Sequence, residues 1–89
     1  MQYPTESKIR GWRAVAVFGD GTECLLYLGR STTQVRAGYA AAYLEVLDAE
    51  EQARVRTVSL ECWQGVPDAG TWVRKSTLPI PVRESVAVA

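Results

Sequence analysis

Two extended segments with apolar residues on both of their alternating sides lie near the start of the chain. Residues 8–18 are rich in β-branched and aromatic side chains, and residues 22–28 repeat this character after Gly19-Asp20-Gly21. Glycines accept the positive φ angles that tight turns between antiparallel strands require. The pattern therefore predicts a β-hairpin over residues 9–28.

Neither strand of this hairpin has a purely polar side. In the first strand, Val15 and Val17 alternate with Trp12, Ala14, Ala16 and Phe18. In the second, Cys24, Leu26 and Leu28 alternate with Glu23, Leu25 and Tyr27. Since successive side chains of a strand point to opposite faces, both faces of the sheet are expected to be covered.

A single helix is predicted from Thr33 to about Gln52. Ser31 and Gln34 have the spacing of a capping box, which satisfies the first free N–H groups of a helix. Apolar residues then recur at helical spacing and form one stripe: Val35, Tyr39, Ala42, Tyr43, Val46 and Leu47. The acidic second half of the helix is interpreted as a solvated face or as a docking surface for a basic partner.

Residues 54–64 form the third predicted strand, with Val58, Leu60 and Cys62 on one side and Thr57, Ser59, Glu61 and Trp63 on the other. A strand–helix–strand crossover is right-handed, so this strand should run parallel to the second, with the first strand between them. Residues 72–75 could add a short edge strand. The prediction is an α+β domain over residues 8–76, with a three-stranded, largely antiparallel sheet and one helix on one face.

An extended C-terminal arm is predicted over residues 77–89. Its prolines fix φ and lack an N–H donor, which excludes a central strand. One helix shields only one face of the sheet, and the other face is expected to hold Trp12, Tyr27, Trp63 and Trp72. Either the arm folds back over these aromatic residues as a lid, or another protein binds there. The candidate partner-binding residues are Trp12, Arg13, Tyr27, Trp63, Trp72, Leu78, Pro79, Ile80, Pro81 and Val82.

The composition argues against several functional classes. The chain has no histidine, the commonest general base and metal ligand, and its two cysteines, Cys24 and Cys62, do not make a zinc site. We therefore expect no enzyme activity, no cofactor and no metal. Ten basic residues balance ten acidic ones, which argues against broad nucleic-acid binding. We find no signal peptide or transmembrane stretch, so the expected location is cytoplasmic, with both thiols reduced.

Four segments resemble a family of short cyanobacterial proteins known only as a domain of unknown function. They are Gly11-Trp12, residues 24–29 (CLLYLG), residues 42–47 (AYLEVL) and residues 58–64 (VSLECWQ). That family has a Trp-rich start, a C-x-Y-Y-F-G strand, a G-Y-I-E-D-L helix segment and a closing strand near V-E-I-K. The chain departs from it at Leu26, at Ala42 and in its longer C-terminal extension. The family has no established catalytic residues, so none transfer.

The resemblance implies a function as a non-catalytic adaptor or linker in a larger assembly. Its cyanobacterial setting points to the phycobilisome, with phycobiliproteins as partners and a place peripheral to a photosynthetic membrane. This link is an analogy of fold. A small nucleic-acid-binding domain of the hairpin-plus-helix type and a small regulator of an enzyme are the alternatives.

Overall fold

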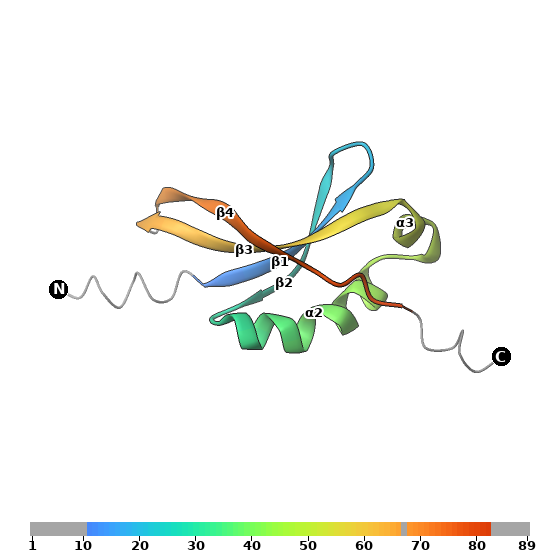
Figure 1. Cartoon of the computed structure of the whole chain (residues 1–89), viewed down its shortest axis with the longest axis horizontal. Coiled ribbons are helices and arrows are strands. Elements are labelled where there is room, and N and C mark those ends of the chain that lie inside the picture. Colours follow the sequence, from blue (N-terminus) through green and yellow to red (C-terminus); the bar gives the residue numbers. More distant parts are fainter. Residues whose placement is uncertain (1–10, 67, 83–89) are drawn as a thin grey trace.

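The computed structural model describes residues 11–66 and 68–82, which form one twisted sheet with helices at one face and one end (Figure 1). In chain order the elements are β1 (Trp12–Phe18), β2 (Glu23–Gly29), α2 (Thr32–Val46), α3 (Ala49–Arg54), β3 (Val55–Val66) and β4 (Ala69–Leu78). The described part of the chain is therefore an α+β domain, as the sequence predicts. The expected three strands and one helix are wrong, because a fourth strand and a second helix are present.

The strand order is β2-β1-β3-β4, and each neighbouring pair is antiparallel. Strand β1 lies between β2 and β3, so these two strands run in the same direction. Both features of the predicted sheet are confirmed. They follow from the crossover through α2, which returns the chain to the far side of β1.

Strand β4 is much longer than the short edge strand expected at residues 72–75. It pairs with β3 from Val58 opposite Leu78 to Val66 opposite Ala69. Gly65 and Gly70 face each other near the end of this hairpin, and Gly65 has a φ of +114°. A Cβ atom on Gly70 would lie 2.3 Å from the Gln64 carbonyl oxygen, so glycine is required for this close approach.

The predicted single helix is interrupted at Leu47 and Asp48. Leu47 has an extended backbone, and the Asp48 carboxylate accepts a hydrogen bond from the Glu51 N–H at 2.8 Å. The Glu51 carboxylate in turn accepts from the Asp48 N–H at 2.9 Å. This reciprocal capping box begins α3 and ends the continuous helix.

The first helix begins as predicted. The Ser31 hydroxyl accepts a hydrogen bond from the Gln34 N–H at 3.1 Å. The Gln34 side chain, however, accepts from the N–H of Arg30, one residue before the position expected for a capping box, at 2.6 Å. The N-terminus of α2 is therefore fixed from both sides, directly after the end of β2.

The main core lies between the sheet and α2. Most of the predicted helical stripe is buried, but Val46, the last residue of α2, is 51% exposed. The buried core residues are Ala14, Ala16, Leu26, Val35, Tyr39, Tyr43, Leu47, Val58, Leu60 and Leu78. They come from both helix and strands, and they leave the opposite side of the sheet without a helix in the described part of the chain (Figure 1).

Candidate functional site

We call the side of the sheet opposite α2 the open face. Its residues follow from the strand pairing, because directly paired residues point to the same face. One row across the sheet contains Leu25, Val15, Ser59 and Thr77, and the next contains Leu28, Arg13, Glu61 and Arg74. Trp63 and Trp72 form a third row on β3 and β4. The open face thus has apolar side chains on β2, charged side chains in the row of Arg13 and Glu61, and the aromatic pair on β3 and β4.

The centre of the open face is buried although neither described helix covers it. Val15 is 2% exposed and Ser59 is fully buried. The Ser59 hydroxyl has no hydrogen-bond partner in the described structure. The two central strands therefore expose little side-chain surface on this face.

Arg13 connects the charged and aromatic parts of this face. Its Nε donates a hydrogen bond to the Glu61 carboxylate at 2.7 Å, and Glu61 is itself largely buried. The Arg13 guanidinium also lies 4.3 Å from the centre of the Trp72 ring. An ion pair and a cation–π contact thus hold the same side chain in place.

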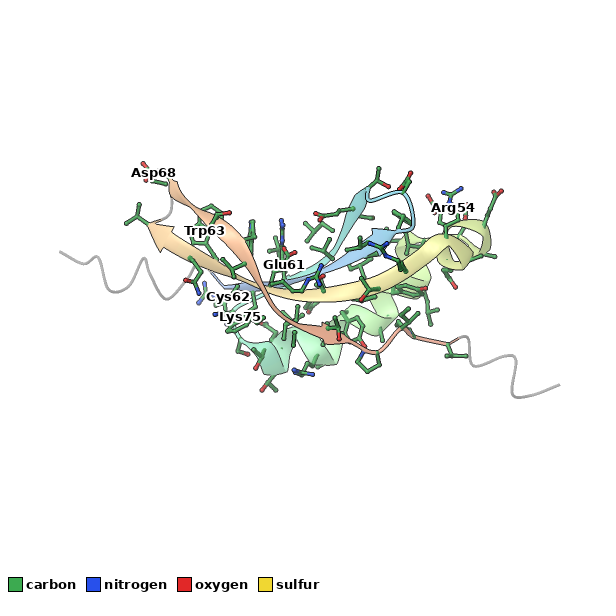
Figure 2. All side chains as sticks on the ribbon, turned by 45° about the horizontal axis from the view of Figure 1, so that its top comes forward. Arg54, Glu61, Cys62, Trp63, Asp68 and Lys75 are labelled. Atoms are coloured by element: carbon green, nitrogen blue, oxygen red, sulfur yellow. The ribbon has the colours of Figure 1, made fainter. Side chains whose placement is uncertain are left out.

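Trp63 and Trp72 form a rigid pair near the end of the β3–β4 hairpin. Their ring centres are 5.3 Å apart, and the rings meet edge to face. The Trp63 indole N–H donates to the Val66 carbonyl at 3.0 Å. Both rings are half-buried, and Figure 2 shows Trp63 on the part of the hairpin that projects beyond α2. The pair is therefore oriented in advance and still partly open to solvent.

Two leucines on β2 complete the open face. Leu25 is 48% exposed and Leu28 is 56% exposed, and both pair with open-face residues of β1. A β-bulge between the Ala14 and Val15 pairs brings them to the same side, because it inserts Leu26 between the two pairing positions. A strict two-residue alternation puts Leu25 and Leu28 on opposite faces, so the sequence pattern did not identify this pair.

Trp12 and Tyr27 do not lie on the open face, and the prediction that places them there is wrong. Both pack against the main core on the side of α2. Trp12 shares its face with Ala14 and Ala16, as the alternation of β1 requires, and the bulge in β2 turns Tyr27 the same way. A Cβ atom on Gly38 would lie 2.4 Å from the Tyr27 ring, so the ring rests directly on α2.

The beginning of the predicted arm is part of the folded domain. Leu78 is the last residue of β4 and lies in the main core. The Tyr39 hydroxyl donates a hydrogen bond to the Pro79 carbonyl. Pro81 is half-buried, whereas Ile80 and Val82 are exposed.

Residues 83–89 of the predicted arm lie outside the described residues. The described part of the arm follows the side of the sheet that α2 covers and does not cover the Trp63–Trp72 pair.

Burial affects the ionisation of two tyrosines of α2, Tyr39 and Tyr43. It raises the pKa of the Tyr39 hydroxyl, and nearby Arg36 opposes this rise to a smaller extent. Burial also raises the pKa of Tyr43. Both hydroxyls therefore favour their neutral forms more strongly than a tyrosine in water does.

The remaining candidate chemistry is limited. Cys24 and Cys62 are free and half-buried, on strands β2 and β3, which β1 separates. Within residues 11–66 and 68–82, no cluster of His, Cys, Asp or Glu side chains is suited to hold a metal ion. Neither helix in this part has the length and hydropathy needed to cross a membrane.

No family model matches the sequence, and comparisons with curated proteins and with solved structures found no similar protein. The function must therefore be argued from the open face itself.

Proposed function

We propose that the protein is a non-catalytic protein-binding module that joins a larger assembly through its open face. The observation that carries this proposal is the combination of a partly exposed Trp63–Trp72 pair and two exposed leucines on a face that no described helix covers. Tryptophan and arginine are the residue types that most often dominate binding energy at protein interfaces. Truncation of such a side chain at the centre of an interface costs about 2 kcal/mol or more where it is a hot spot.

The rigidity of the aromatic pair supports this function. Arg13 is held by Glu61 and lies against Trp72, and Trp63 is fixed by its hydrogen bond to the backbone. Side chains that are already ordered lose less conformational freedom when a partner binds. This arrangement therefore favours a contact surface.

Charge on the open face argues for a protein partner over nucleic acid. Arg13 and Arg74 are balanced by Glu61 and by Glu23, which pairs with Val17 at the other end of the face. Binding to the phosphate backbone requires an excess of basic residues. The face has none, so the hairpin-plus-helix mode of DNA binding is the weaker proposal.

Identification of the assembly as a phycobilisome depends only on the resemblance of short sequence motifs, and it stays a prediction. The proposed role as an adaptor does not require it. Regulation of an enzyme would use the same kind of contact. These alternatives differ in the partner and not in the surface that this chain contributes.

The proposal is tested by purifying the tagged full-length chain from its native cells and identifying the proteins that accompany it. We expect Trp72→Ala and Arg74→Glu each to remove the main partner. Glu50→Ala, an exposed change on α3, is the control and should retain it. Circular dichroism and thermal melting establish that each variant is folded. If folded Trp72→Ala and Arg74→Glu variants both retain every partner, the open face is not the contact surface.

A further inference from the structure

We propose that the free edge of strand β2 pairs with β2 of a second copy of this chain, so that the two sheets join edge to edge. β2 is an outer strand of the sheet, and no described segment pairs with its far side. Backbone N–H and C=O groups along such an edge pair readily with another extended chain. The inference goes beyond the proposed function, because it uses β2, whereas Trp63 and Trp72 lie on β3 and β4.

The two edges of the sheet differ in how they are protected. On the other outer strand, Lys75 lies at a break in the register of β4 with β3, and Pro79 and Pro81 follow the strand. Lysine, bulges and proline are the features that commonly prevent edge-to-edge pairing. β2 has neither lysine nor proline, and it exposes Leu25 and Leu28. The edge of β2 is therefore the one suited to pairing.

The bulge in β2 determines which strand fits beside it. Because of the bulge, Leu26 and Tyr27 both face α2, whereas Leu25 before them and Leu28 after them face the open side. A regular strand alternates strictly between faces, so it cannot match this pattern along its whole length. A second, antiparallel β2 matches it when Leu25 pairs with Leu28 of the other copy, because the pattern is symmetric about the middle of the bulge. The two bulges then oppose each other.

The side chains of this register are complementary. Leu25 of each copy lies beside Leu28 of the other, at the usual cross-strand distance of about 5 Å, and the exposed leucines of both copies form one apolar cluster. Glu23 lies opposite Arg30 of the other copy, and this contact occurs twice. Both residues are exposed, and neither forms an ion pair within residues 11–66 and 68–82. The Arg30 backbone N–H donates to Gln34, so side chains make this outer contact.

Helix α2 leaves room for the second copy. A two-fold axis perpendicular to the sheet places the two α2 helices on the same side of the joined sheet, next to each other. The flank of α2 that borders β2 contains Gly38, which lies directly against the Tyr27 ring. Ala41, three residues later and therefore on the same flank, is small and exposed. Small side chains at a helix contact permit a short interaxial distance.

Analytical ultracentrifugation of the purified full-length chain tests the inference. Pairing along one edge covers a small area, so we expect a weak dimer and extend the concentration from about 1 to about 500 µM. Glu23→Arg and Arg30→Glu should each raise the dissociation constant at least tenfold, because each places like charges opposite each other at both ends of the paired strands. An equimolar mixture of these two variants should regain the affinity of the unchanged chain, since every opposed pair is then of opposite charge.

Lys75→Glu is the matched control, because it reverses an exposed charge at the other edge of the sheet. It should leave the equilibrium unchanged. Thermal melting verifies that all three variants fold.

Four results would overturn the inference: a monomer at every concentration, a dimer that neither β2 variant weakens, a mixture that associates no better than its components, and a dimer that Lys75→Glu weakens. The proposed function has a separate test. If the chain is monomeric but Trp72→Ala still removes the partner in the purification experiment, only the inference about β2 fails. If β2 pairs as expected but Trp72→Ala and Arg74→Glu retain every partner, only the proposed function fails.

Discussion

At the scale of single residues, Arg13 joins the charged and the aromatic parts of the open face. It neutralises the largely buried Glu61 and lies against Trp72. The sequence identifies Arg13 as a candidate next to the aromatic residues, but not its ion pair with Glu61. That pair depends on register, because only the alignment of β1 with β3 brings the two residues opposite each other. Register also separates Trp63 and Trp72 from Trp12, although all three have the same chemistry.

Removal of the Arg13 side chain should destabilise the domain more than removal of the Arg74 side chain, which lies in the same row of the sheet. Arg13→Ala leaves the buried Glu61 carboxylate without its cation, and we expect a loss of roughly 2–3 kcal/mol in the free energy of unfolding. Arg74→Ala, an exposed residue of the same charge, should change it by less than about 0.5 kcal/mol. Urea denaturation measures both. Equal losses would mean that the ion pair does not stabilise the open face.

At the scale of elements, the hairpin, the strand order and the beginning of α2 could be predicted from the sequence because each has a local cause. The Gly-rich turn, the cap at Ser31 and the handedness of the crossover are such causes. The break before α3 also has a local signature, Asp48 followed three residues later by Glu51, but the apolar stripe continues through Leu47 and hides it. The bulge in β2 depends on pairing with β1, so no pattern within β2 alone reveals it.

Leu78, at the end of β4, belongs to the core, and truncation of its side chain should therefore destabilise the domain. Leu78 is 4% exposed and packs with Val58, so we expect Leu78→Ala to lower the free energy of unfolding by about 2–5 kcal/mol. Val82→Ala, at an exposed position four residues later, should cost less than about 0.5 kcal/mol. Both values come from chemical denaturation. A negligible cost for Leu78→Ala would show that the chain after Thr77 is an independent arm.

At the scale of the whole molecule, one side of the sheet has a helix and an ordered core, and the other has side chains that fit a contact surface. The core side contains the buried residues Tyr39 and Tyr43, and the Tyr39 hydroxyl ties the helix to the chain after β4. The open side contains balanced charges, a fixed aromatic pair and exposed leucines. Stability and binding are therefore assigned to opposite faces, and each is open to a separate test.

The tyrosines predict how stability changes with pH. Because burial raises the pKa of Tyr39 and Tyr43, the unfolded chain loses these protons first as the pH rises past about 10. The folded state then holds more protons than the unfolded state, so the free energy of unfolding should fall as the pH rises through this range. Urea denaturation between about pH 8 and 11 measures the slope. Tyr43→Phe should make the slope shallower, and an unchanged slope would contradict the assignment to Tyr43.

Hydroxyl-radical footprinting of the full-length chain, dilute and in its native assembly, tests the central claim most directly, because it reports the solvent exposure of individual side chains. The account predicts that Trp63, Trp72, Leu25 and Leu28 are oxidised in the dilute chain and become protected in the assembly. Val46, exposed on α2, should be oxidised equally in both. If these open-face residues are already protected in the dilute chain, or remain oxidised in the assembly, then the open face is not where this protein binds.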